Sequence, residues 1–228
     1  MEENKAKILV VDEWETPVSA YPEKRVRKAR IKKAVYNEGL YYMEGVCGFD
    51  FFMVKKPITV TVLQVKSRGG WGDVMVDDPL HAIGMAELAK ASKGRVLVAG
   101  LGLGLILHYL DRNESVTSVD VVEINKDVIR LIKPLLPEFK YDFRIIRQGF
   151  FDYITYKCKE EYDTVILDLW VGMGSEAMFL EMLGAHSLVK ERLPHSNVYV
   201  WGVGKPDLNP AVKKEPIYWR ALREGVWR

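Results

Sequence analysis

The stretch VLVAGLGLGL, residues 96–105, decides the fold. Its first half is an apolar, β-branched run typical of a buried strand, and it leads directly into Gly100, Gly102 and Gly104. Glycines between a strand and a helix let the chain turn sharply, and they let a ligand reach the free N–H groups at the helix start. The alternative is a tight turn without a ligand, which alternating glycines would weaken without gain. The stretch therefore predicts a ligand-binding loop, which also includes Leu101.

The sequence after this loop alternates apolar strands with amphipathic helices. The expected strands are residues 95–100, 116–124, 143–149, 164–170 and 197–203, and the expected helices are 105–110, 125–136 and 175–190. Such alternation predicts βαβ units around a parallel sheet, with right-handed crossovers that place helices on both faces. The fourth strand should then lie beside the first, on the side away from the second. Residues 205–228 leave room for about one more helix.

The sequence before residue 81 differs in composition, because aromatic and β-branched runs dominate it. Residues 39–54 and 58–65 predict a small sheet of hairpins. A helix is expected over residues 81–92, with Asp78 and Pro79 as an alternative start, as N-cap and first helical residue. We therefore expect a small β-rich region at 1–80 and an α/β domain at 81–228.

Glu123 supplies a second element of a nucleotide site, because it ends the strand that follows the glycine loop. Parallel strands end at the same sheet edge, where a carboxylate can accept both hydroxyls of a ribose. The structural alternative is a charge at a helix start that Asn125 caps. NAD is disfavoured, since its G-x-G-x-x-G pattern would need a glycine where Leu105 stands.

The G-x-G-x-G loop, the acidic strand end VVEIN and the strand YDTVILDLW resemble class I S-adenosylmethionine-dependent methyltransferases. The nearest branch is that of spermidine synthase, and the resemblance covers about residues 92–203. It implies a methyltransferase-like Rossmann fold, a doubly wound and mostly parallel sheet, with S-adenosylmethionine as cofactor. The cofactor-binding residues that it implies are Gly100, Leu101, Gly102, Gly104, Glu123, Ile124, Gln148 and Phe150. Ile124 and Phe150 would lie against the adenine, and Asp152 is the alternative to Gln148.

Departures from the spermidine synthase pattern bear on the substrate. That branch usually has an aspartate where Leu103 stands, and a second one three residues after the aspartate that corresponds to Asp168. Here Val171 occupies that place, so the carboxylates that hold an amine substrate are missing. Many methyltransferases also carry an acidic residue at the position of Val98.

Asp168 is the candidate catalytic residue, as a contact to substrate or cofactor, with turn capping as the structural alternative. Asp78, His81 and Trp170 are the candidate substrate residues. Asp78 could instead cap a helix, and Trp170 could simply pack. No metal site is expected, because the histidines and the two cysteines lack ligand spacing.

Methyl transfer from S-adenosylmethionine to an unidentified, small-molecule acceptor is the function expected. Aminopropyl transfer and a non-catalytic cofactor-binding protein of the same fold remain alternatives. A formal net charge of +2, the lack of a long apolar run and the lack of a leader favour a cytoplasmic protein without a membrane partner.

Two further expectations concern partners. A homo-oligomer could cover the sheet edge beyond the fifth strand. A basic run near the N-terminus could bind nucleic acid, but a solvated helix or edge strand is the favoured interpretation. That run comprises Lys24, Arg25, Arg27, Lys28, Arg30, Lys32 and Lys33.

Overall fold

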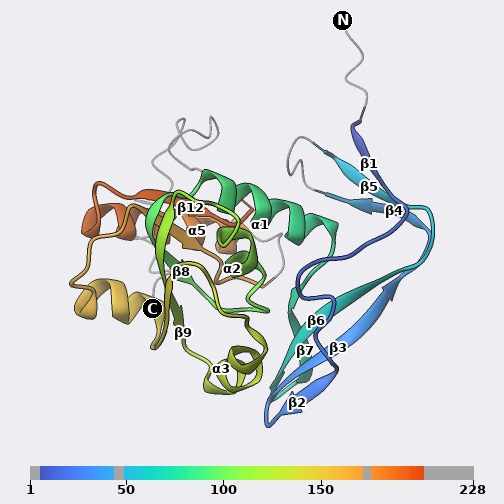
Figure 1. Ribbon diagram of the computed structural model, residues 1–228, viewed down its shortest axis with the longest axis horizontal. Helices are drawn as coiled ribbons and strands as arrows, with labels where there is room; N and C mark the ends of the chain where they lie inside the picture. Colours follow the sequence, from blue (N-terminus) through green and yellow to red (C-terminus); the bar gives the residue numbers. More distant parts are fainter. Residues whose placement is uncertain (1–5, 44–48, 172–175, 203–228) are drawn as a thin grey trace, which may run out of the picture.

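The computed structural model describes residues 6–43, 49–171 and 176–202 (Figure 1). The expected tail helix at 205–228 and the first residue of the helix expected at 175–190 lie outside the described residues.

The central element is a parallel sheet of five strands in the order β10-β9-β8-β11-β12. The sheet confirms the expected doubly wound architecture, with the fourth strand of the domain, β11, beside the first, β8. Its strands are β8 (Gly94–Ala99), β9 (Val116–Glu123), β10 (Asp142–Arg147), β11 (Thr164–Leu167) and β12 (Asn197–Val200).

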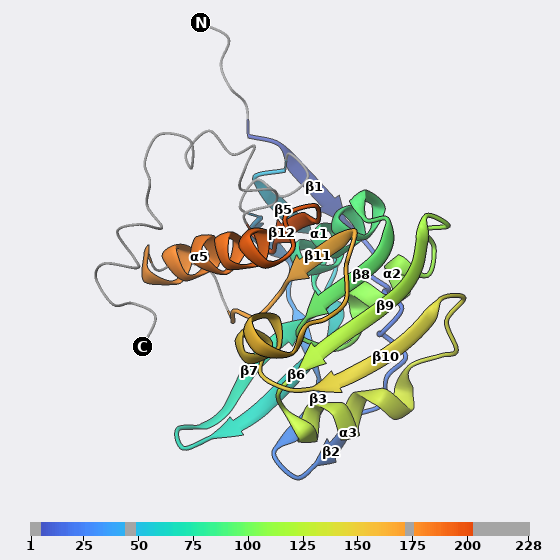
Figure 2. The same ribbon diagram turned by 90° about the vertical axis from the view of Figure 1, so that its left-hand side faces the viewer.

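Helices cover both faces of this sheet (Figure 2). One face packs against α1 (Pro79–Ala91), α2 (Leu105–Leu110) and α3 (Lys126–Ile132), the last continued by η2 (Lys133–Leu135). The other packs against α4 (Phe150–Asp152), η3 (Tyr153–Lys157) and α5 (Glu176–Arg192). Neighbouring residues of β8 alternate between these cores, as strand geometry requires: Val96 and Val98 join the first, and Leu97 and Ala99 the second. None of the described helices is long and apolar enough to cross a membrane.

The N-terminal region forms two sheets. An antiparallel sheet has the order β2-β3-β6-β7, and a three-stranded sheet has the order β1-β5-β4. Within the range of the hairpin prediction, β4 pairs antiparallel with β5 and β6 pairs antiparallel with β7. The sequence made no prediction for β1, which pairs in parallel with β5, a long-range contact that no local turn signals. The strands are β1 (Ile8–Val11), β2 (Lys24–Val26), β3 (Ala29–Tyr36), β4 (Gly39–Tyr42), β5 (Phe51–Val54), β6 (Ile58–Ser67) and β7 (Gly70–Val76).

The four-stranded sheet packs on the α/β domain through a shared hydrophobic core. Ile31 and Leu63 of this sheet belong to the same buried cluster as Val96 of β8. Met75 of β7 reaches the glycine loop itself, where its sulfur accepts a hydrogen bond from the Leu103 N–H at 3.0 Å. The N-terminal sheet thus forms a wall beside the loop.

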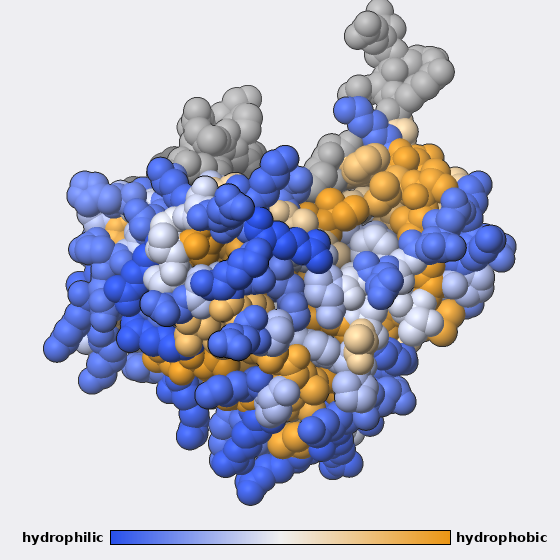
Figure 3. Space-filling model, in the orientation of Figure 1, coloured by the Kyte–Doolittle hydropathy of each residue, from blue (hydrophilic) through white to orange (hydrophobic). Residues whose placement is uncertain are grey.

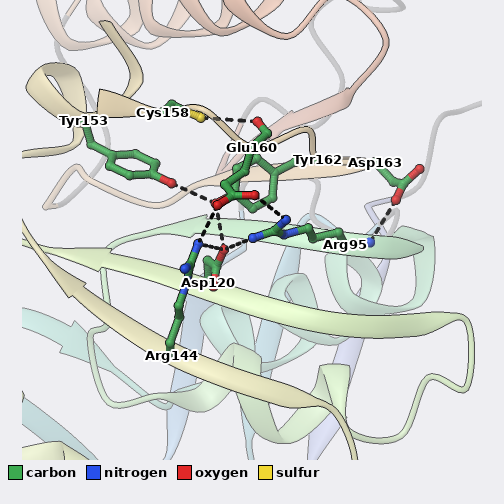
Figure 4. Close-up of polar contacts among 8 residues, drawn as sticks. All are labelled: Arg95, Asp120, Arg144, Tyr153, Cys158, Glu160, Tyr162 and Asp163. Carbon is green, nitrogen blue, oxygen red and sulfur yellow. Dashed lines mark hydrogen bonds and ion pairs between the residues drawn. The ribbon is translucent and has the colours of Figure 1, made fainter. Parts of the chain in front are cut away.

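A charged network lies on the opposite face of the parallel sheet (Figure 4). The buried carboxylate of Asp120, in the middle of β9, accepts hydrogen bonds from Arg95 at 3.0 Å, from Arg144, and from the Tyr162 hydroxyl at 2.7 Å. Tyr162 also pairs with the Tyr153 hydroxyl at 2.8 Å. Burial by itself would raise the pKa of Asp120, but these hydrogen bonds outweigh it and lower the pKa.

Candidate cofactor and acceptor cavity

The glycine loop follows β8 in a conformation that suits glycine. Gly100, Gly102 and Gly104 have φ angles of 95°, 52° and 75°, in the left-handed region. A Cβ on Gly100 would collide with the backbone oxygen of Asp168, and one on Gly102 would collide with the Met75 sulfur. The loop therefore needs glycine at both positions, because neighbouring elements approach its backbone closely.

Glu123 ends β9 beside this loop, as expected from the sheet edge. One carboxylate oxygen accepts the Leu101 N–H at 3.0 Å, and the other accepts the Asn125 N–H at 2.6 Å. Asn125 in turn caps α3 by accepting the Asp127 N–H at 3.0 Å. These backbone bonds fix the carboxylate, and each of its oxygens keeps a further lone pair for a ligand.

A cavity of about 590 Å³ opens where the sheet edge meets the β6–β7 hairpin. This volume lies within the range of small-molecule and cofactor sites. Its lining residues are Leu63, Val65, Val74, Met75, His81, Gly100, Gly102, Val122, Glu123, Ile124, Asn125, Val128, Gly149, Phe150, Phe151, Asp152, Asp168, Leu169, Trp170 and Val171. Gly100 and Glu123 belong to the glycine-loop side, whereas β6, β7 and the segment after β11 form an apolar side.

Asp168 follows β11 and lines this cavity. Its backbone N–H donates to the Ala99 oxygen at 3.1 Å, which holds it against β8. Among the described residues its carboxylate has no hydrogen-bond partner, and burial raises its pKa to about 6, with attraction to His81 limiting the rise. The carboxylate is therefore available both to a ligand and as a proton acceptor near neutral pH.

His81 lies at the cavity wall in a fixed orientation. Its ring stacks on Trp201 at a centroid distance of 5.2 Å, and its Nδ1 lies 2.9 Å from Asp78. Asp78 is also the N-cap of α1, because it accepts the His81 N–H at 3.0 Å, and it accepts the Tyr36 hydroxyl at 2.9 Å. Burial alone would raise the pKa of Asp78, but the hydrogen bonds from His81 and Tyr36 lower it. Asp78 thus supports the wall without lining the cavity.

The structure brings most of the expected site residues to the cavity. Those that line it are Gly100, Gly102, Glu123, Ile124, Phe150, Asp168, His81 and Trp170. Four others do not line it. Leu101 is buried and donates its N–H to the Glu123 carboxylate, and Gly104 packs against Leu136. Gln148 donates its backbone N–H to the backbone oxygen of Glu123, and Asp78 caps α1. Asp152, the alternative to Gln148, does line the cavity.

Sequence reasoning missed the wall that β6 and β7 provide. Leu63 and Val65 of β6 and Val74 and Met75 of β7 line the cavity. The apolar character of these strands was readable, but their position opposite the glycine loop depends on long-range packing.

The acidic residues of the spermidine synthase pattern have no substitute at the corresponding places. Leu103 is fully buried in the core, and Leu169, Trp170 and Val171, which follow Asp168, line the cavity with apolar surface. Among the described residues, the apolar side of the cavity therefore has one carboxylate, Asp168.

The strand order, glycine loop and acidic strand end define a doubly wound, nucleotide-binding type of α/β domain. The family model described as spermine/spermidine synthase domain matches residues 81–203, more than half of the chain, and the protein belongs to this family. A comparison with curated proteins finds no match.

Solved structures that resemble the chain include human methyltransferase-like protein 13 in complex with SAH, at 23% identity, and spermidine synthase from Thermotoga maritima, at 15%. The first match covers 50% of this chain and 56% of that chain with a TM-score of 0.36, and the second 59% and 56% with 0.37. A methyltransferase from Thiobacillus denitrificans in complex with S-adenosyl-L-homocysteine is 18% identical, with coverages of 54% and 48% and a TM-score of 0.35. The chain thus spans about half the length of these structures, and likenesses this low carry no argument about chemistry.

Proposed function

We propose that the protein binds S-adenosylmethionine in this cavity and transfers its methyl group to an acceptor that enters along the apolar side. The observation that carries the proposal is one cavity that joins the glycine loop and Glu123 to a carboxylate, Asp168, surrounded by apolar side chains. Family membership supports the cofactor class.

The residues present fit this cofactor. The loop backbone at Gly100 and Gly102 lies open to the cavity, and Glu123 keeps lone pairs for the two ribose hydroxyls. Ile124, 72% exposed, and Phe150 supply apolar surface for an adenine ring. When bound, the cofactor supplies an electrophilic methyl carbon on a sulfonium sulfur.

The chain's own residues would position the acceptor and accept its proton. Methyl transfer is largely in-line positioning, so it needs few acid or base groups. Trp170, Val74 and Met75 exclude water from the acceptor side, and Asp168, ionised above pH 6, takes the proton that the acceptor releases.

Aminopropyl transfer is the second candidate, because the family match favours it. The apolar residues at 103 and 169–171 count against it, since a polyamine carries several positive charges that need carboxylate partners.

Calorimetric titration tests the proposal. We expect S-adenosylmethionine to bind and Glu123→Gln to weaken it about tenfold, because the amide cannot accept from both ribose hydroxyls while holding the loop. Glu114→Gln, a change of an exposed glutamate away from the cavity, should leave the affinity unchanged. Stronger binding of decarboxylated S-adenosylmethionine would favour aminopropyl transfer, and no binding of either would refute the proposed function.

A further inference from the structure

The basic run near the N-terminus folds into strands that meet other basic elements at one end of the molecule. Of the two structures expected for it, a solvated helix or an edge strand, the structure contains the strand, since β2 is the sheet edge and β3 follows it. Figure 3 shows hydrophilic side chains around this lower end, and Figures 1 and 2 both place β2, β3 and α3 there.

The cations of four elements are gathered there by direct contacts. The Lys66 N–H donates to the Lys28 oxygen at 2.8 Å, which joins the β6–β7 hairpin to the β2–β3 turn. The Lys28 N–H lies 3.4 Å from Asp127 of α3, and Arg130 lies 3.7 Å from the same carboxylate. We call this set the basic surface: Lys24, Arg25, Arg27, Lys28, Arg30, Lys66, Arg68, Lys126 and Arg130.

Two of these cations are held in place by an aromatic side chain. The guanidinium of Arg30 lies 4.1 Å from the ring centroid of Trp71, and that of Arg25 lies 5.1 Å from it. Trp71 thus fixes both charges on the β2–β3–β6–β7 sheet, which lowers the entropy lost when they bind an anion.

The acidic groups on these elements do not neutralise the basic surface. Asp127 is buried beside the Lys28 backbone N–H and Arg130. Asp73, which accepts from the neutral Gln64 amide, keeps its negative charge, so three carboxylates, Glu23 included, stand against nine cations. Glu23 accepts the Lys33 N–H. The surface keeps an excess of positive charge.

The basic surface adjoins the cavity on the α3 side, where Asn125, which lines the cavity, is followed by Lys126. Successive side chains of a strand point to opposite faces, so Lys66, which follows the cavity residue Val65 on β6, lies on the other face of the sheet with its pairing partner Trp71. An extended ligand bound to both groups of cations would therefore pass round the edge of this sheet. The carboxylates of Asp168, Glu123 and Asp152 lie inside the cavity, whereas the cations lie outside it. This arrangement suits a ligand with a neutral group inside and a chain of negative charges outside.

We infer that the basic surface binds the phosphate backbone of a single-stranded nucleic acid, one of whose bases enters the apolar side of the cavity. The inference rests on the proposed function, because the base would be the methyl acceptor. An unpaired base can leave a single strand without loss of pairing, and apolar and aromatic residues such as Trp170 and Phe151 can receive it. A cationic polyamine would instead be repelled at the mouth.

Fluorescence anisotropy with a labelled single strand of about 20 nucleotides tests the inference. We expect binding at about 50 mM salt that weakens steeply towards about 200 mM. The triple variant Lys28→Glu/Lys66→Glu/Arg68→Glu should bind at least about tenfold more weakly. The slope of the logarithm of affinity against the logarithm of salt concentration should become shallower by about 2, because each lost phosphate contact contributes about 0.7.

The control variant Lys55→Glu/Lys56→Glu/Lys90→Glu has the same change in net charge at exposed positions away from the cavity. It should bind the strand as the unchanged protein does, and circular dichroism and thermal melting establish that both variants fold. Equal weakening by both variants, no strand binding, or equally tight binding of heparin would overturn the inference.

The position of the strand is tested by photocrosslinking with 4-thiouridine in the same strand. Crosslinks to the peptides that carry Val65, Val74 or Trp170 support entry of a base, and crosslinks confined to other surfaces overturn it. Strand binding is measured without S-adenosylmethionine, so failure of the cofactor proposal and failure of this inference are distinguishable.

Discussion

Asp120 lies on β9 and Asp168 directly follows β11, the two strands that flank β8, yet their surroundings are opposite. Asp120 is surrounded by donors from Arg95, Arg144 and Tyr162, and its pKa is lowered. Asp168 has no hydrogen-bond partner for its carboxylate among the described residues, and burial raises its pKa to about 6. The first carboxylate stabilises the fold, whereas the second is kept at a cost in stability, as is usual for groups that act on a ligand.

The Asp120 network also supports the cavity indirectly. Tyr162 connects Asp120 to Tyr153, and Tyr153 belongs to η3, which continues directly from the α4 residues Phe150 and Asp152 at the cavity. The Asp120 network therefore helps to hold one wall of the cavity in place.

Asp120→Asn should have the largest effect on stability. It leaves the arginines without their negative partner, and because both are partly exposed we expect a loss of about 2 to 3 kcal/mol in the free energy of unfolding. Urea denaturation at pH 7 measures this loss.

Glu160→Gln is the matched control for Asp120→Asn, because Glu160 pairs with Arg95 at the surface. An exposed ion pair contributes about 0 to 1 kcal/mol, so this variant should change little. A loss as large as that of Asp120→Asn would show that burial of Asp120 is not what matters.

Asp168→Asn should change the free energy of unfolding in the opposite direction, by stabilising the protein. The folded-state pKa of Asp168 is raised above its unfolded value, so its ionisation lowers stability as the pH rises from about 4 through about 6. Asparagine removes this penalty and should stabilise the protein at pH 7 by on the order of 2 kcal/mol. This gain in stability should shrink towards pH 4. Once an acceptor is known, the same variant should transfer the methyl group about two orders of magnitude more slowly.

Denaturation of Asp168→Asn across this pH range measures the change. A variant less stable than the unchanged protein at pH 7 would show that the carboxylate has a structural partner, and the contrast with Asp120 would then disappear.

Local sequence patterns were sufficient to predict the place of β11 beside β8, the glycine loop and the place of Glu123. Each depends on short signals, namely an apolar run, alternating glycines and an acidic strand end. Right-handed crossovers then place these signals at one sheet edge.

Long-range contacts could not be predicted in the same way. The parallel pairing of β1 with β5, the contact of Met75 with Leu103 and the network around Asp120 join residues far apart in the chain. Asp120 looked like any polar residue of a strand, because its partners Arg95 and Tyr162 lie on other elements. Such contacts are set by tertiary packing, about which local sequence patterns carry no information.

The measurement that tests the account most directly compares the affinities of S-adenosylmethionine and S-adenosylhomocysteine between about pH 5 and 7.5 by calorimetry. The two differ in the positive charge of the sulfonium, which an ionised Asp168 at the cavity wall attracts.

We predict that the preference for S-adenosylmethionine rises as the pH increases through about 6, where Asp168 ionises. The rise should persist in His81→Gln, which removes the imidazole whose charge acts on Asp168, and vanish in Asp168→Asn. A preference that does not change with pH in the unchanged protein, or failure to bind either compound, would contradict the placement of the cofactor between Glu123 and Asp168.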